Sequence, residues 1–366
     1  MRVAGLFSQP VMNVPTLFDP VRLGALELRN RIVMAPMTRS RAGSDDAPTE
    51  LAVEYYRQRA SAGLIVSEGT QPSANGKGYP RTPGIYTRAQ IRGWRAVTDA
   101  VHAAGSTMVL QLMHCGRIAS RHNKDAGAST VAPSAVRAAG VMYTDSAGAV
   151  EFDLPRALTA DEIPQVVGEY RDATLRALEA GFDGVELHCA SGYLPEQFLS
   201  SNTNLRTDRY GGSAANRARL AVEVLATLSE AAGTGRVGLR ICPGNHFNDI
   251  HDASPPETFA ALLDAVRPLG LAYLHLVHLK LPGFDTLELA RAHFTGPLII
   301  NDSLTYELAQ RYVADGVASA ASFARPYIAN PDLVRRLREG RSLAAFDRST
   351  LYTAGAHGYT DYPPLD

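Results

Sequence analysis

The chain has 366 residues, of which 45% are hydrophobic and 20% charged, enough for one large soluble domain or two ordinary ones. Its 36 basic and 37 acidic residues give a formal charge of −1. This balance excludes the basic surface that binding to nucleic acid or to an anionic membrane requires. The composition therefore favours a small-molecule partner.

The three cysteines, Cys115, Cys189 and Cys242, are too few and too widely spaced for a disulfide framework, and none forms a Cys-x-x-Cys pair. We therefore expect a reducing, cytoplasmic location. Residues 1–20 lack a sustained apolar run, so they predict neither a signal peptide nor a membrane span but an extended lead-in segment.

Short apolar runs recur along the chain with helical patterns between them. Nearly every position in these runs is apolar, which is typical of strands buried on both faces of a parallel sheet. The runs are RIVMAPM (31–37), GLIVSEG (63–69), STMVLQL (106–112), FDGVELH (182–188), RVGLRI (236–241), AYLHLVH (272–278), PLIIN (297–301) and ASAASF (318–323).

The segments between the runs carry helical periodicity, most clearly in 50–63, 162–181 and 216–233. Eight strands, each followed by a helix, predict a single-domain (β/α)₈ TIM barrel spanning residues 1–366. An open doubly wound sheet is the alternative, but the segment after the first run, MAPMTRSRAG, lacks the Gly-x-Gly-x-x-Gly turn that such sheets usually carry.

One segment interrupts this alternation of strands and helices. Residues 113–161, rich in Gly, Ala, Ser and His, separate the third strand from its helix and are longer than a plain connection. We interpret this insertion as a lid over the mouth of the barrel.

Polar residues at the ends of the predicted strands are the first candidates for chemistry, because barrel active sites are built from the loops that follow the strands. A single histidine at such a position is more often a structural residue with satisfied hydrogen bonds than a catalyst, so the sequence context has to decide. The candidates are Thr38, Arg39, Glu68, Thr70, Gln111, His114, His188, Arg240, His278, Asn301, Asp302 and Arg325.

The context of His188 is distinctive, because it is followed by CASGYLPEQFLSSNTNLRTDRYGGSAANR. Other segments, in order, are LFDPVRLGALELRNRIVMAPMTRSRA, YYRQRASAGLIVSEGT, PGIYT, VHAAGSTMVLQLMHCGR, RPYIANPDLVRRLREG and GYTDYP. With this series, nearly the whole chain resembles the Old Yellow Enzyme family of FMN-dependent ene-reductases.

The resemblance implies that FMN lies across the top of the barrel and that NADPH or NADH reduces it. A guanidinium near the flavin stabilises negative charge on the reduced ring, and hydroxyl and amide groups adjust its electronics. The implied cofactor residues at the ring end are Pro36, Met37, Thr38, Gly69, Gln111 and Arg240.

The implied reaction passes hydride from the nicotinamide through the flavin to an electron-poor C=C bond, as in an enone, enal or nitroalkene. By resemblance His188 donates a hydrogen bond to the acceptor oxygen, and Tyr193 supplies the proton to the α-carbon. As alternatives from the residues alone, Tyr193 is a packing aromatic and Arg240 an ordinary salt-bridged arginine of the barrel.

The sequence departs from the family pattern at three places. Ser191 replaces the second hydrogen-bond donor, and Met113 replaces a tryptophan beside the flavin. At the phosphate end, the family's glycine-containing turns, whose backbone N–H groups bind phosphate, are replaced. The residues at this end are Asp302, Ser303, Ala324 and Arg325.

Three other functions are considered at this stage. A barrel that binds flavin weakly or not at all would be an isomerase using His188 and Tyr193, or a small-molecule binding protein. A metal-dependent hydrolase would use the three cysteines with His114, His188 and His246, but no spacing resembles a ligand pair, and Cys189 should point away from the mouth if His188 points in. We therefore predict no metal site, and we consider a homodimer as the assembly.

Overall fold

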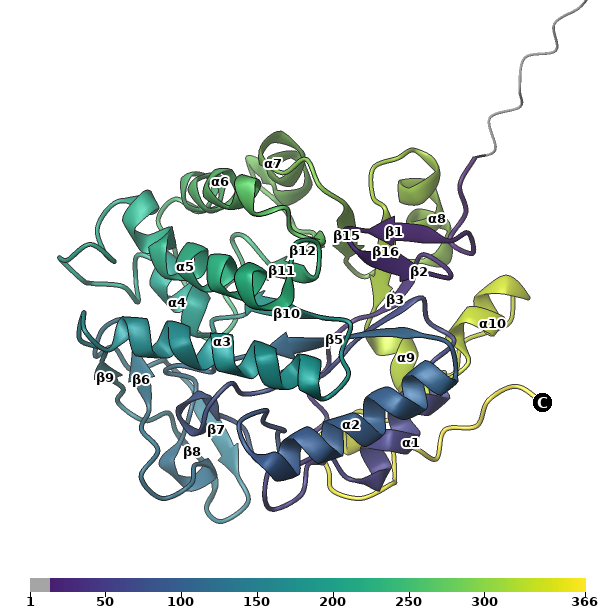
Figure 1. Ribbon diagram of the computed structural model, residues 1–366, viewed down its shortest axis with the longest axis horizontal. Helices are drawn as coiled ribbons and strands as arrows, with labels where there is room; N and C mark the ends of the chain where they lie inside the picture. Colours follow the sequence, from purple (N-terminus) through teal and green to yellow (C-terminus); the bar gives the residue numbers. More distant parts are fainter. Residues whose placement is uncertain (1–13) are drawn as a thin grey trace, which may run out of the picture.

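The computed structural model describes residues 14–366, so most of the predicted lead-in segment lies outside the described residues. Eight parallel strands close into a barrel, in the order β3, β4, β5, β10, β11, β12, β15 and β16, and β16 pairs with β3 (Figure 1). Seven of the strands fall within the predicted runs, and β10 extends one residue beyond its run, to Cys189. The bounds are β3 (Ile32–Met34), β4 (Leu64–Val66), β5 (Thr107–Leu112), β10 (Gly184–Cys189), β11 (Val237–Ile241), β12 (Tyr273–Val277), β15 (Leu298–Asn301) and β16 (Ala320–Phe323).

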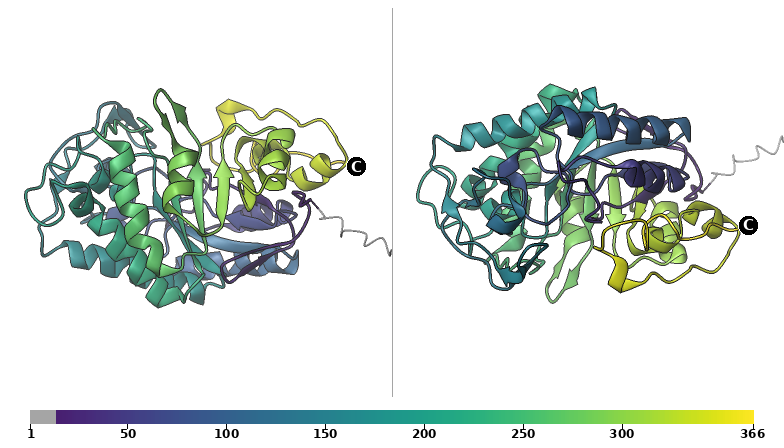
Figure 2. Two further views of the ribbon diagram at one scale, coloured as in Figure 1. Left: turned by 90° about the horizontal axis from the view of Figure 1, so that it is seen from above. Right: turned by 90° about the horizontal axis from the view of Figure 1, so that it is seen from below.

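Helices enclose the strands in all three ribbon views (Figures 1 and 2), and the (β/α)₈ prediction is confirmed. The three clearest predicted helices form as α1, α3 and α5, and Gly233 caps α5 with a positive φ of 88°. The bounds are α1 (Glu50–Gln58), α2 (Arg88–Ala103), α3 (Ile163–Glu179), α4 (Leu194–Leu199), α5 (Ala214–Ala232), α6 (Pro255–Val266), α7 (Thr286–His293), α8 (Tyr306–Ala314), α9 (Arg325–Ala329) and α10 (Leu333–Arg338).

A hairpin that the sequence analysis did not predict closes the bottom of the barrel. Strands β1 (Val21–Leu23) and β2 (Leu26–Leu28) pair antiparallel, and their leucines pack in one cluster with inward side chains of the barrel strands. Gly24 turns the hairpin at φ 58°, where an added Cβ would lie 2.6 Å from the carbonyl oxygen of Gly235. The hairpin therefore plugs the end opposite the mouth.

The insertion 113–161 consists mostly of loops, and its regular structure is four short strands and one 3₁₀ turn. Strands β7 and β8 form a hairpin, and β6 pairs with β9. Among residues 14–366, none of the helices combines the length and the apolar character needed to span a bilayer. The remaining bounds are β6 (Val131–Ala132), β7 (Val141–Thr144), β8 (Gly148–Glu151), β9 (Arg156–Ala157), β13 (Lys280–Leu281) and β14 (Phe284–Asp285).

Two buried arginines after β3 hold the C-terminal segment against the barrel. Arg39 donates to the carbonyl oxygens of Leu351 and Gly358, at 3.3 and 2.7 Å. Arg41 is 5% exposed and donates to a larger set of acceptors. These acceptors are the carbonyl oxygens of Arg39, Thr350, Leu351, Gly355 and His357 and the Thr353 hydroxyl.

We expect Arg41→Met to release this segment, because each carbonyl loses a charged donor while the stem of the side chain is retained. The free energy of unfolding should fall by about 2 kcal/mol or more, measured by urea titration. Limited proteolysis should then cut between residues 349 and 359 faster than in the unmodified protein. Arg92→Met, at an exposed position on α2, is the control. Unchanged stability and cleavage for Arg41→Met would contradict this account.

Candidate active site

A cavity of about 880 Å³ opens at the carboxyl ends of the barrel strands. Loops after β3 and β4, the ends of β5 and β10, the β7–β8 hairpin and the C-terminal segment all contribute to its wall. Its lining includes the predicted site residues Pro36, Thr38, Gly69, Gln111, Met113, His188, Ser191 and Tyr193.

His188, near the end of β10, is 6% exposed and lines the cavity. Burial, together with the positive charge of Arg240, lowers its pKa to about 3, so the ring is neutral at pH 7. Its Nδ1 atom is buried and has no hydrogen-bond partner among the described residues. A buried ring nitrogen without a partner is uncommon, and this one lies in the wall of a cavity able to hold a ligand.

Tyr193 lies one residue before α4 and also lines the cavity. Its ring centroid is 5.0 Å from that of His188, and its hydroxyl donates to the hydroxyl of Tyr79 at 3.2 Å. Burial raises the pKa of Tyr193 well above its usual value, so the phenol keeps its proton at neutral pH. The structure thus places a protonated acid beside a neutral imidazole.

The turn between these two residues is conformationally restricted. Ser191 and Gly192 have positive φ angles of 59° and 79°. Non-glycine residues rarely adopt this region, and asparagine is tolerated there better than serine. Asn248 donates to the carbonyl oxygen of Ser191 at 2.7 Å, and Gln197 donates to that of Gly192 at the same distance, so neighbouring segments fix the turn.

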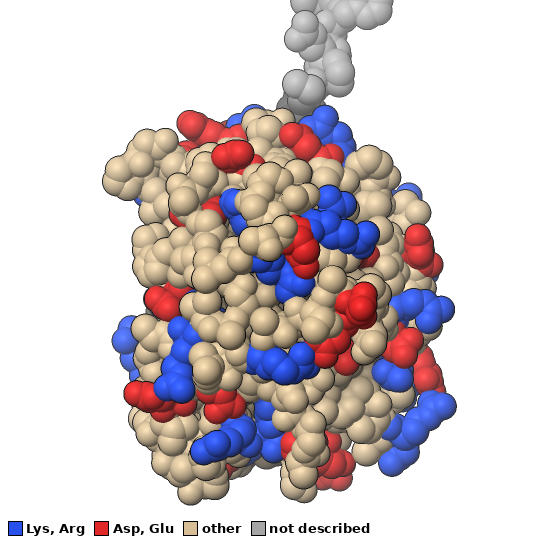
Figure 3. All heavy atoms as spheres, turned by 90° about the vertical axis from the view of Figure 1, so that its left-hand side faces the viewer, with Lys and Arg blue, Asp and Glu red and all other residues tan. Residues whose placement is uncertain are grey.

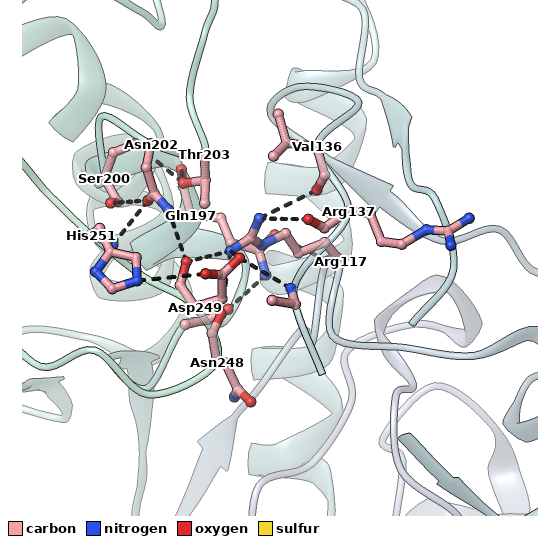
Figure 4. A network of polar contacts seen from close by, with 12 residues as sticks. Arg117, Val136, Arg137, Gln197, Ser200, Asn202, Thr203, Asn248, Asp249 and His251 are labelled. Atoms are coloured by element: carbon pink, nitrogen blue, oxygen red, sulfur yellow. Dashed lines mark hydrogen bonds and ion pairs between the residues drawn. The ribbon is translucent and has the colours of Figure 1, made fainter. Parts of the chain in front are cut away.

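A buried arginine connects these neighbours (Figure 4). Arg117 is 1% exposed and donates to the carbonyl oxygens of Asn248 and Asp249, at 3.3 and 2.6 Å. Its backbone N–H donates to the side chain of Gln197 at 3.1 Å. The network therefore ties the loop after β11 to the start of α4 and supports the turn at Ser191.

Beneath the cavity lies a layer of polar side chains that point into the barrel. Gln111 donates to one oxygen of Glu186 at 2.8 Å, and His275 Nδ1 lies 2.8 Å from the other. Arg240 is 2.6 Å from His275 Nε2 and 2.8 Å from Asn301 Oδ1. Two of the predicted cofactor residues, Gln111 and Arg240, thus belong to one hydrogen-bonded layer.

Five predicted cofactor residues, namely Met37, Asp302, Ser303, Ala324 and Arg325, are not part of the cavity lining. Met37 packs against the hydrophobic core, so its side chain does not line the cavity. Asp302 and Ser303 are exposed on the loop after β15, Ala324 is partly exposed after β16, and Arg325 is exposed at the first position of α9. Asp302 Oδ2 lies 3.9 Å from Nδ1 of His278, which gives the carboxylate a nearby partner.

Several other strand-end residues do not reach the cavity. Arg39 is turned toward the C-terminal segment, and Glu68 accepts from the Arg39 backbone N–H at 3.2 Å. Thr70 donates to the carbonyl oxygen of Glu68, while His114 is fully buried and accepts from Gly116 N. These four residues hold the loops at the barrel mouth through hydrogen bonds to backbone groups.

Sequence reasoning missed four residues of the site. Tyr79 follows β4 and Tyr352 belongs to the C-terminal segment, and both line the cavity. Glu186 and His275 lie inside strands that otherwise read as apolar. A charged or titratable residue within such a run was the available signal, because a side chain pointing into the barrel needs a polar partner there.

The cysteine positions do not favour the metal alternative. Cys189 packs in the hydrophobic core while His188, its neighbour, faces the cavity, as the alternation of a strand requires. Within residues 14–366, no three His, Cys, Asp or Glu side chains are grouped so as to hold a metal ion.

The residues at the ring end fit a flavin. The Gln111 amide lines the cavity, and the Arg240 guanidinium lies in the layer directly beneath it. The orphaned Nδ1 of His188 adds a buried polar atom that only a ligand or water can satisfy. The fold and the site together define a (β/α)₈-barrel oxidoreductase with a place for a flavin ring.

Comparisons with known proteins agree with this class of protein. The sequence profile of the NADH:flavin oxidoreductase / NADH oxidase family matches residues 16–344. A flavin oxidoreductase of Emericella nidulans is 41% identical over 387 residues, covering 95% of this chain and 97% of that protein. A probable flavin mononucleotide-dependent alkene reductase of Leishmania infantum is 39% identical over 357 residues, covering 96% and 98%. The structure of morphinone reductase superposes with a TM-score of 0.92 at 44% identity, covering 97% and 98%.

The chain therefore belongs to the NADH:flavin oxidoreductase / NADH oxidase family, which is the Old Yellow Enzyme family.

The neutral state of His188 can be tested by pH titration. Because the pKa of the ring is lowered to about 3, its ¹⁵N shifts should stay constant between pH 5 and 8 in the folded protein. In urea the same ring should titrate near pH 6.5. The unfolded chain thus binds this proton first, so the contribution of His188 to stability falls as pH drops from about 6.5 toward 3. A folded-state midpoint near 6.5 would contradict this.

Proposed function

We propose that His188 and Tyr193 carry the chemistry of this FMN-dependent ene-reductase, which reduces an electron-poor C=C bond at the expense of NADH or NADPH. The observation that carries the proposal is the pair itself: a neutral imidazole and a protonated phenol, 5.0 Å apart by ring centroid, in the wall of one cavity. FMN, when bound, supplies the hydride carrier between the nicotinamide and the alkene.

His188 binds the acceptor oxygen of the substrate. A neutral ring carries a single N–H donor, and a hydrogen bond aimed at an oxygen that gains negative charge is typically worth about 10²–10³ in rate. This assignment gives the buried, unpartnered ring the ligand that it lacks among residues 14–366. Because the ring stays neutral, it orients and polarises the oxygen without giving up a full proton.

Tyr193 delivers the proton to the α-carbon of the substrate. Its raised pKa keeps the hydroxyl protonated before the reaction, and the hydroxyl of Tyr79 at 3.2 Å can turn to donate to the oxygen once the proton has left. Tyr79 therefore stabilises the charge that develops on Tyr193. The alternative of Tyr193 as a packing aromatic leaves its cavity-facing position without a purpose.

Ser191 and Met113 set the substrate preference. Both line the cavity, and serine is a shorter donor that stays neutral, so a water or His188 alone completes the contacts of the acceptor oxygen. Met113 contributes a flexible apolar wall, which admits bulkier substrates than a flat tryptophan would. We further propose that segment 113–161 acts as a lid, since its hairpin residues Val141, Met142 and Tyr143 line the same cavity.

If FMN is bound, its phosphate would be held by the loop after β15 and the start of α9, where Ser303 would supply a hydroxyl and Arg325 a cation. A carboxylate about 5 Å from a phosphate costs about 3 kcal/mol per unit charge at an effective dielectric of 20. Asp302 opposes binding by this effect.

The surface is compatible with a small-molecule enzyme. Basic and acidic side chains are interspersed over the face seen in Figure 3, without a large area of one sign. Family membership does not favour the flavin-independent isomerase or the binding protein. The homodimer and the cytoplasmic location stay predictions from the sequence.

Tyr193→Phe should slow reoxidation of the reduced enzyme by an enone or nitroalkene about 10²- to 10⁴-fold, because the proton donor is removed. Reduction of the flavin by NADPH or NADH should change little. Anaerobic stopped-flow spectroscopy of the two half-reactions measures both rates. Tyr79→Phe is the matched control, and it should slow only the alkene step and by less. Equal slowing of both half-reactions by Tyr193→Phe would argue against Tyr193 as the acid.

Asp302→Gly should tighten FMN by about tenfold to a hundredfold, because a carboxylate near the phosphate is removed. Quenching of FMN fluorescence measures the affinity. Asp302→Asn separates the loss of charge from the added freedom of glycine, and Asp315→Asn, at an exposed position after α8, controls for net charge. An unchanged affinity for Asp302→Gly would mean that the carboxylate does not face the phosphate.

A further inference from the structure

In the polar layer beneath the cavity, the donors and acceptors of the hydrogen bonds determine which nitrogen of His275 carries the proton. Arg240 Nη1 lies 2.6 Å from His275 Nε2, and a guanidinium can only donate. His275 Nε2 must therefore be the unprotonated nitrogen, and Nδ1 carries the proton. The hydroxyl of Ser322, 2.7 Å from Nε2, also acts there as a donor.

The other end of the ring leads to the same tautomer. His275 Nδ1 lies 2.8 Å from Glu186 Oε2, and an ionised carboxylate can only accept. Burial opposes the charge on Glu186, but the hydrogen bonds from His275 and Gln111 and the charge of Arg240 outweigh it, so the pKa of Glu186 is lowered. Burial and the same arginine lower the pKa of His275 to about 4, so the ring is neutral.

Glu186 also fixes the amide of Gln111. The second carboxylate oxygen, Oε1, is 2.8 Å from the side-chain nitrogen of Gln111, which must be the donor. The amide oxygen of Gln111 therefore points away from Glu186, and Gln111 lines the cavity. One buried carboxylate thus determines the orientation of two cofactor-facing groups, a glutamine amide directly and an arginine through a histidine.

We infer that Glu186 and His275 are positioning residues, which present the oxygen of Gln111 and the guanidinium of Arg240 to the flavin ring. The inference rests on the proposed flavin site. Because a neutral histidine separates Glu186 from Arg240, the guanidinium forms no ion pair with a carboxylate of residues 14–366. Its charge therefore stays available to the electron-rich side of the ring, while Asn301, 2.8 Å from Nη2, fixes its plane.

Glu186→Gln tests this, because an amide cannot accept from two donors through both of its ends. If its nitrogen faces His275, the proton moves to Nε2, where it opposes the donor of Arg240. If its nitrogen faces Gln111, that amide must turn and present its nitrogen to the cavity. The first rearrangement displaces the Arg240 guanidinium and the second turns the Gln111 amide, although glutamine has nearly the same shape as the glutamate it replaces.

We expect Glu186→Gln to raise the FMN dissociation constant about ten- to a hundredfold, to make the reduction potential of bound flavin more negative, or both. A lowered potential indicates that Arg240 has been displaced, and weaker binding alone indicates that Gln111 has turned. Fluorescence titration of the deflavinated protein and dye-equilibration potentiometry of the holoenzyme measure the two quantities. Glu169→Gln, on α3, is the matched control, because it makes the same change to a carboxylate that accepts from Ser73 at 2.7 Å.

A measurement on the unmodified protein keeps the test independent of how the variant folds. Long-range ¹H–¹⁵N spectra should show His275 protonated at Nδ1 from pH 5 to 9, with its signal among the ten histidines assigned by its loss in His275→Gln. Protonation at Nε2 would overturn the inference, as would a folded Glu186→Gln protein with unchanged affinity and potential. Failure of the unmodified protein to bind FMN would instead refute the proposed function and the flavin-facing part of the inference, while the tautomer would still decide whether Glu186 and His275 position Gln111 and Arg240.

Discussion

The parallel register of the closed barrel brings side chains from neighbouring strands into layers across the barrel axis. In this chain a lower layer contains Val109, Tyr273, Ile299 and Ala320, packed against the β1–β2 hairpin. Two residues further along the same strands, on the same face, lie Gln111, His275, Asn301 and Ser322. The step of two residues therefore changes the interior from apolar to polar just below the mouth.

The polar layer places two charged groups inside the barrel, where the loss of hydration costs free energy. Glu186 and Arg240 lie in the barrel interior, and the desolvation of such groups can exceed their mutual attraction. The layer offsets the cost by giving both carboxylate oxygens a donor and the guanidinium two acceptors. Replacing buried charges by a hydrophobic layer of similar volume is often neutral or stabilising, so stability alone does not explain the polar layer, whereas the proposed flavin site above it does.

The strands could be predicted from the sequence because burial on both faces leaves a local signal, a run of apolar residues. The partners of individual polar residues left no such signal. Arg41 was not singled out from the sequence, because five of its six acceptors lie more than 300 residues away. Tyr352 faces the cavity only because that segment is held there. Such contacts depend on how the loop after β3 packs against the C-terminal segment, and these two segments are too far apart in the sequence for a local pattern to reveal the contact.

The candidate site likewise contains residues held by the barrel strands and residues outside them. His188, Gln111 and Arg240 come from strands whose paired register fixes each side chain, with His188 opposite Arg240 and Arg240 opposite His275.

Asp302 lies on the exposed loop after β15 and Arg325 is the exposed first residue of α9, positions where a substitution disturbs no packed layer. The fold therefore constrains the geometry around the proposed ring site far more tightly than it constrains the proposed phosphate end. A change at Asp302 would alter how firmly the proposed site holds FMN while His188 and Tyr193 keep their places.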